Sequence, residues 1–172
     1  MDRSAHSSSD DDFSDVVAAN AAYAETFRLK GLPAVAGLGL GVVTCMDSRI
    51  EPLNMLGLAP GDAKILRNAG ARVTDDVLRT LVLAVHLLGV RRVMVVPHTR
   101  CKMAQATEDE VHATIAEKGL DSRSLEFRMV ADQEATLRAD VQRIDSWPFL
   151  HGDVVVGGFL YDVDTGLLRR VC

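Results

Sequence analysis

The chain has 172 residues, of which 48% are hydrophobic and 25% charged, and its formal net charge is −5. This length suits one globular domain with its own hydrophobic core. The acidic balance and the lack of a Lys/Arg block argue against a dedicated nucleic-acid surface, and no apolar run is long enough to span a bilayer.

The N-terminal region is polar before it becomes amphipathic. Residues 1–12 include the run Ser7-Ser8-Ser9-Asp10-Asp11-Asp12, which predicts a disordered tail ahead of a single domain at 13–172. This tail lacks the apolar segment of a secretory signal. The chain has three cysteines, an odd number, and they are far apart in the sequence, which does not indicate a disulfide framework. We therefore expect a cytoplasmic protein. Apolar residues spaced among polar ones predict a first helix over 13–29.

Five short apolar segments are typical of β-strands. Residues 41–46 and 92–97 are runs of the kind found in buried strands, and 63–67 is a second short strand candidate between them. A fourth run covers 154–161, and a hairpin turn connects it to a last strand at 167–171.

Helical patterns separate these strands. They cover 50–58, 105–118 and 132–144, together with a longer helix that starts at Thr74 and is closed by Gly89. Alternating strands and helices favour parallel pairing through right-handed crossovers. The sequence thus predicts an α/β fold, a three-layer αβα domain with a mostly parallel central sheet of four strands plus an antiparallel edge strand.

Two short motifs carry most of the chemical information. Cys45-Met46-Asp47-Ser48-Arg49 ends the first predicted strand, and His98-Thr99-Arg100-Cys101 follows the third. Two thiolates and one imidazole are zinc ligands, and three protein ligands leave the fourth position open, as in catalytic sites. Because ligands bind outside the carboxyl ends of parallel strands, we expect both motifs to meet at one edge of the sheet.

Each of these residues also has a structural interpretation when taken alone. Cys45 could be a small hydrophobic residue of the core, and His98 a packed or capping side chain. Asp47 and Arg49 could form a structural ion pair. Their joint placement at strand ends in one α/β domain favours a metal site. A cysteine nucleophile is disfavoured, because Asp47 rather than a histidine lies beside Cys45 in the sequence.

The two motifs together match a known pattern. Cys45-x-Asp47-x-Arg49 followed by His98-x-x-Cys101 resembles the zinc signature of the β-class carbonic anhydrases. The segments 67–70 and 73–78 also resemble that family, and the resemblance runs from about residue 16 to residue 171, with similarity to the short prokaryotic members.

The resemblance implies a carbonate dehydratase, a zinc lyase that reversibly hydrates carbon dioxide to bicarbonate through a zinc-bound hydroxide. Cys45, His98 and Cys101 would hold one Zn²⁺ per subunit. Asp47 would orient the hydroxide and Arg49 would hold Asp47, forming a catalytic dyad. In a closed form of similar enzymes, Asp47 would itself become the fourth zinc ligand.

The resemblance also implies features around the site. Asn68 and Gly70 would help to bind the substrate. The N-terminal helix would pack on a neighbouring subunit of a homodimer, or of a dimer of dimers, with the active site near the interface.

One part of the second motif departs from the family pattern. Members often carry an acidic or small residue and then a glycine around the second zinc cysteine, whereas Arg100 and Lys102 flank Cys101 here. Two cations beside the metal would favour anions and lower the pKa of bound water further. This departure leaves two alternatives open: hydrolysis of carbonyl sulfide or carbon disulfide by the same zinc hydroxide, and a zinc-binding homologue without catalysis.

Overall fold

The computed structural model describes residues 13–172, so the predicted tail at 1–12 lies outside the described residues. Contacts divide the chain into a first unit that ends at Leu32 and a second unit, Pro33–Cys172. The helix of the first unit, α1 (Ser14–Glu25), ends four residues earlier than predicted. It ends where the Thr26 hydroxyl donates a hydrogen bond back to the carbonyl of Tyr23 (3.1 Å), which competes with further helical bonding.

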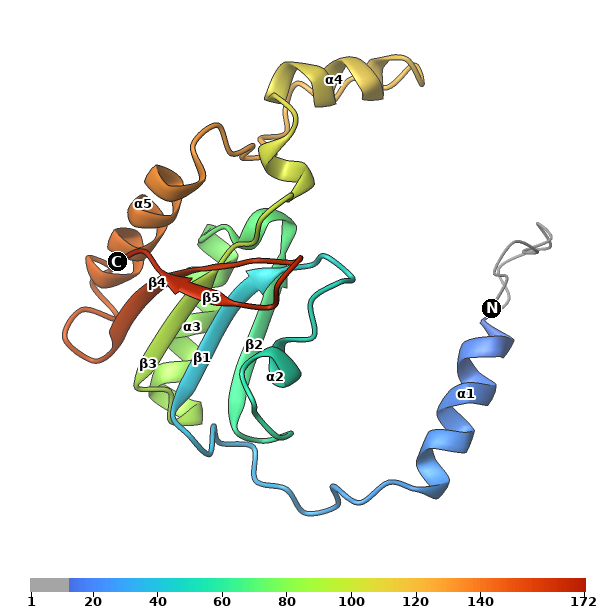
Figure 1. Cartoon of the computed structure of the whole chain (residues 1–172), viewed down its shortest axis with the longest axis vertical. Coiled ribbons are helices and arrows are strands. Elements are labelled where there is room, and N and C mark those ends of the chain that lie inside the picture. Colours follow the sequence, from blue (N-terminus) through green and yellow to red (C-terminus); the bar gives the residue numbers. More distant parts are fainter. Residues whose placement is uncertain (1–12) are drawn as a thin grey trace. The chain divides into compact units, whose positions relative to one another are not determined.

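The second unit contains a five-stranded sheet whose order is β2-β1-β3-β4-β5 (Figure 1). Strands β1 to β4 run parallel to one another, and β5 is antiparallel to β4. This arrangement confirms the predicted α/β fold with an antiparallel edge. The strands are β1 (Leu40–Cys45), β2 (Ala63–Asn68), β3 (Arg92–Val96), β4 (Val155–Tyr161) and β5 (Leu168–Arg170).

Capping residues explain where the helices of this unit begin and end. They are α2 (Pro52–Met55), α3 (Asp75–Leu88), α4 (Glu108–Ala116) and α5 (Gln133–Asp145), with 3₁₀ turns at Ala69–Ala71 and Lys102–Ala104. The side chain of Thr74 accepts a hydrogen bond from the backbone of Val77, and Gly89 closes α3 with a φ of 75°, as predicted. Helix α2 is shorter than predicted, because Pro52 opens it and Gly57, with a φ of 65°, follows its end.

Helix α4 begins three residues later than predicted. Thr107 and Glu110 form a capping box, in which each side chain bonds the other residue's backbone N–H. Residues 105 and 106 therefore belong to the connection from the preceding 3₁₀ turn.

The core covers both faces of the central strand, β1, whose six residues are all buried. On one face Val43 belongs to a cluster with Leu81 of α3 and Ile144 of α5. On the other face Val42 belongs to a cluster against which Met55 of α2 packs. Burial on both sides explains the continuous apolar run of β1, and it holds the carboxyl end of this strand rigidly.

Within residues 13–172, none of the helices combines the length and apolar character needed to cross a membrane.

Candidate metal centre

The sheet brings both sequence motifs to one edge. Cys45 is the last residue of β1. His98 lies two residues beyond β3 and forms a parallel bridge with Tyr161 at the end of β4. Cys101 immediately precedes the 3₁₀ turn that begins at Lys102. The carboxyl ends of β1 and β3 thus position all three predicted ligands.

The three side chains form a compact, buried cluster. The sulfur atoms of Cys45 and Cys101 and a ring nitrogen of His98 all lie within 4.8 Å of one another, and the two sulfurs are 3.9 Å apart. The cysteines are 4% exposed and the histidine is fully buried. Two sulfurs and one nitrogen converging on a point form a donor set that suits zinc.

The orientation of His98 supports a metal-binding role. Its Nδ1 lies 2.8 Å from the carbonyl oxygen of Thr99. Since a carbonyl only accepts hydrogen bonds, Nδ1 carries the proton and Nε2 keeps its lone pair. Among the residues that the structure describes, Nε2 of His98 is the one buried side-chain polar atom without a partner. A metal ion would accept this lone pair, which otherwise remains unsatisfied in the interior.

The thiols of Cys45 and Cys101 share one proton. A hydrogen bond from Cys101 is the main cause that lowers the pKa of Cys45 to about 4, with help from the Gly70 N–H, while burial opposes the shift. The hydrogen bond with Cys45, and then burial, raise the pKa of Cys101 far above its usual range. One thiolate is therefore available before metal binds, and a metal that takes both sulfurs releases the remaining proton.

A carboxylate is fixed beside the ligand cluster. Arg49 Nε donates to Asp47 Oδ1 (2.9 Å) and Arg49 Nη2 donates to Asp47 Oδ2 (2.7 Å), a bidentate pair. The Arg49 backbone N–H also donates to Oδ1 (3.0 Å). These bonds, led by the guanidinium, hold the pKa of Asp47 well below its usual range. Asp47 Oδ2 is 3.7 Å from His98 Nε2, so a permanent negative charge adjoins the cluster.

Arg67 supports this segment in a way that the sequence analysis missed. Its Nε donates to the carbonyl of Cys45 (2.9 Å), and its Nη2 donates to the carbonyl of Asp47 (2.7 Å). In the sequence, Arg67 was marked only by its place at the end of the second predicted strand and by the resemblance of residues 67–70 to the family. Its contacts follow from the pairing of β2 with β1, which places Arg67 opposite Thr44.

Asn68 and Gly70 lie beside the cluster, and their expected role in substrate binding stays a prediction. The Asn68 side chain accepts a bond from the Arg72 N–H (2.9 Å) and donates to the Arg72 carbonyl (2.7 Å), which closes the loop between them. The Gly70 N–H donates to the sulfur of Cys45 at 3.4 Å. This N–H stabilises the thiolate form of Cys45.

Replacing Gly70 with Ala is expected to destabilise the protein. Gly70 has a φ of 77°, and a Cβ there would lie 3.3 Å from Cβ and Cγ of Met103. The left-handed backbone alone costs roughly 1–2 kcal/mol for an L-residue, and the contact adds to this. Gly57→Ala is the matched control, because Gly57 has a φ of 65° and an added Cβ would have nothing within 4 Å of it. Urea unfolding should show the larger loss for Gly70→Ala; equal losses would rule out a contribution from Met103.

Three pockets lie around this region, and the one lined by Cys101 and Gly70 has a volume of only about 10 Å³. An apolar pocket of about 670 Å³ is bordered by Met46, next to Cys45, and by Met103, which packs against the cysteine cluster. Lys102 also lines it. None of the candidate ligands lines this pocket, although Met46 and Lys102 are each adjacent to one in the chain.

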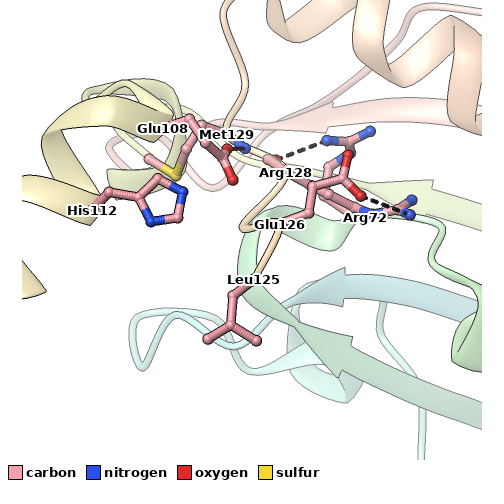
Figure 2. A pocket seen from close by; sticks show the side chains of 7 residues that line it. All are labelled: Arg72, Glu108, His112, Leu125, Glu126, Arg128 and Met129. Atoms are coloured by element: carbon pink, nitrogen blue, oxygen red, sulfur yellow. Dashed lines mark hydrogen bonds and ion pairs between the residues drawn. The ribbon is translucent and has the colours of Figure 1, made fainter. Parts of the chain in front are cut away.

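The third pocket, of about 500 Å³, is a separate charged surface (Figure 2). Its charged groups are already paired within the protein: Arg72 with Asp140 and Arg128 with Glu126. It contains none of the candidate metal ligands. Its lining consists of Arg72, Glu108, His112, Leu125, Glu126, Arg128 and Met129.

Comparison with known proteins agrees with this geometry. A family model described as carbonic anhydrase matches residues 40–168, the segment that contains both motifs. The chain belongs to this family. It is 35% identical to beta-carbonic anhydrase 1 of Mycobacterium tuberculosis (strain ATCC 25618 / H37Rv), over 91% of this chain and 96% of that protein. The resemblance to β-class carbonic anhydrases, and the enzyme class that it implies, are thereby confirmed.

Two further proteins are similar to this chain. A carbonic anhydrase structure from Streptococcus mutans superimposes with a TM-score of 0.88 at 38% identity, covering 93% of this chain and 97% of that one. A carbon disulfide hydrolase of Saccharolobus solfataricus is 30% identical, over 83% of this chain and 81% of its own length. Both carbonic anhydrases and a carbon disulfide hydrolase are therefore among the proteins to which this chain is similar.

Proposed function

We propose that this β-carbonic anhydrase family member catalyses the reversible hydration of carbon dioxide to bicarbonate and a proton. The observation that carries the proposal is the convergence of Cys45, His98 and Cys101 beside a carboxylate that Arg49 holds in the charged state. This arrangement provides metal ligands and an oriented hydrogen-bond acceptor in one place.

Cys45, His98 and Cys101 would hold the zinc ion. The free lone pair of His98 and the adjacent sulfurs fit it, because all three donors are buried and within 4.8 Å of one another. When bound, zinc supplies an acidified water, whose pKa falls from about 15.7 to about 7 in zinc enzymes. Two thiolates place more negative charge on the metal than neutral imidazoles would, and this opposes the acidification of the water. A neighbouring group that orients the attacking water is therefore more important in this site.

Asp47 is the group that we assign to this role. As a carboxylate it accepts a hydrogen bond from the attacking water and directs the oxygen lone pair at the substrate carbon. Arg49 bonds both carboxylate oxygens, so the carboxylate keeps its place. For Asp47 to become a fourth metal ligand, this bidentate pair would have to break, and its presence supports the open form.

The apolar pocket supports a small linear substrate. Met46 and Met103 line it, and their side chains offer no hydrogen bonds that would retain water. Lys102 lines the same pocket and would attract the anionic product. Carbon dioxide fits these properties, and so does carbon disulfide.

Hydrolysis of carbon disulfide or carbonyl sulfide is the second candidate. It is supported by the 30% identity to a carbon disulfide hydrolase, since the same donor set would serve either reaction. A zinc-binding homologue without catalysis is the remaining alternative.

A stopped-flow assay of carbon dioxide hydration across pH, on protein with measured zinc content, tests the proposal. A parallel assay would follow sulfide release from carbon disulfide and carbonyl sulfide. Hydration that scales with zinc content is the expected result. Sulfide release without hydration would establish the second candidate, and neither activity at full zinc occupancy would establish the silent homologue.

We propose further that the protein is a homodimer or a dimer of dimers. None of the residues of α1, all of them described, is buried, and Val16, Val17 and Tyr23 are each more than half exposed. A second subunit would cover this apolar surface. Sedimentation should show a dimer or larger species for the wild type and a smaller species for Val17→Asp; a monomeric wild type would contradict the proposal.

We also propose a cytoplasmic location, since Cys45, Cys101 and Cys172 are all free thiols. Fractionation of cells that produce the protein would test this; recovery from an extracytoplasmic fraction would overturn it.

A further inference from the structure

Arg100 has an unusual backbone conformation between two candidate metal ligands. It is one of three non-glycine residues with positive φ among residues 13–172, and its φ is 55°. A residue with a Cβ adopts this left-handed conformation at an energetic cost, so other contacts must hold it there.

Both ends of Arg100 make such contacts. Its carbonyl oxygen accepts a hydrogen bond from Arg49 Nη2 (3.3 Å), and its guanidinium forms an ion pair with Asp164. The same Arg49 nitrogen donates to Asp47 Oδ2 at 2.7 Å. The Arg100 carbonyl and the Asp47 carboxylate therefore hold the Arg49 guanidinium from two sides.

Asp164 is itself anchored, in the turn between β4 and β5. Its backbone N–H donates to Asp162 Oδ1 (2.8 Å), and the Thr99 hydroxyl donates to the same oxygen (3.4 Å). The Val163 N–H donates in turn to the Thr99 hydroxyl oxygen (3.1 Å). The turn is thus attached to the segment that contains Thr99 and Arg100, and the ion pair adds a second attachment next to the first.

We propose that Arg100 and Asp164 are a positioning pair for the Asp47–Arg49 dyad. The ion pair keeps the Arg100 peptide in its left-handed conformation, so that its carbonyl stays directed at Arg49. Arg49 in turn stays aligned with Asp47. The consequence for catalysis rests on the proposed function, whereas the effect on Arg49 does not.

This role differs from that of a cation that attracts an anionic substrate. Asp164 neutralises Arg100, although the sequence alone suggested an additional positive charge beside the metal. The two roles give opposite results when Asp164 is changed. If Arg100 attracts bicarbonate, Asp164→Asn frees its charge and lowers the KM for bicarbonate, while Arg100→Gln raises it. If the pair positions the dyad, both substitutions lower kcat and leave KM unchanged.

The experiment compares Arg100→Gln, Asp164→Asn and the double charge swap Arg100→Asp/Asp164→Arg on zinc-loaded protein. Glutamine keeps the Cβ that makes the left-handed backbone costly, so Arg100→Gln removes only the ion pair that offsets this cost. Asp76→Asn is the matched control, because it removes the exposed Asp76–Arg79 pair of α3. Each single variant should lower kcat about two- to five-fold, which corresponds to the interaction energy of an exposed ion pair. The charge swap should restore kcat, and the zinc content should stay unchanged in all variants.

A second measurement does not depend on activity. Hydrogen exchange of the Arg49 Nε–H, followed by NMR with ¹⁵N-labelled arginine, reports whether the guanidinium is held in place. Exchange should accelerate in both single variants and not in Asp76→Asn. Unchanged kcat and exchange, or opposite shifts in KM, would overturn the positioning pair. If the wild type neither hydrates carbon dioxide nor hydrolyses its sulfur analogues, the proposed function fails, and the exchange measurement still decides the role of Arg100.

Discussion

Replacing Asp47 with Asn should lower kcat for carbon dioxide hydration by about 100-fold or more, the usual scale for a positioned acid–base group. Asparagine keeps the size of the side chain but replaces one acceptor oxygen with an NH₂ group. That group cannot accept a bond from Arg49 Nη2, which now donates to Asp47 Oδ2. The three candidate ligands are untouched, so zinc content should stay at the wild-type value.

The chain offers a close control for this substitution. Asp121 and Arg123 repeat the two-residue spacing and the bidentate bonds of Asp47 and Arg49, with Nε–Oδ1 at 2.9 Å and Nη2–Oδ2 at 2.6 Å. They lie outside the ligand cluster and are exposed. Asp121→Asn should leave kcat unchanged. Stopped-flow assays together with zinc analysis separate the outcomes, and wild-type kcat in Asp47→Asn would remove the role assigned to this carboxylate.

Replacing Cys101 with Ser should abolish zinc retention. A serine hydroxyl does not ionise near neutral pH, so it loses the thiolate–zinc bond that Cys101 would supply. Replacing a residue that only hydrogen-bonds to a metal ligand already lowers metal affinity about 10- to 100-fold, and loss of a ligand itself should lower it further. Activity should fall in proportion to the zinc that is lost.

Cys172→Ser is the matched control, because Cys172 is free and lies outside the ligand cluster. Zinc per subunit after dialysis against a weak chelator is the primary measurement. Thermal unfolding with and without added zinc is the second, since a ligand that binds only the folded state raises the melting temperature. The zinc-dependent rise should be present in Cys172→Ser and absent in Cys101→Ser. Full zinc occupancy in Cys101→Ser would exclude Cys101 as a ligand.

Local patterns were sufficient to predict most of the fold. The apolar run of β1 predicted a strand covered on both faces, and Thr74 and Gly89 marked the ends of α3, because caps depend on residue type. The predictions were less accurate where a local contact overrode periodicity, as at Thr26 after α1 and at Thr107 before α4.

The candidate ligands could also be predicted, because chain order places them. Cys45 and His98 follow parallel strands, and parallel strands bring their carboxyl ends to one edge whatever the details of packing. The spacing of Asp47 and Arg49 similarly keeps the two side chains within reach of each other in the folded chain.

The sequence by itself thus determined the order of the elements, the donor atoms of the candidate metal centre and the charged pair beside it, since these follow from residue type and short-range spacing. Only the tertiary structure decided that Arg100 is neutralised by Asp164, that Arg67 holds two carbonyls of the first motif, and that the Gly70 N–H faces the sulfur of Cys45. These contacts join segments that are distant in the chain. Their geometry depends on how the strands and turns pack, because a shift of a few ångströms between segments makes or removes a hydrogen bond without any change in local pattern.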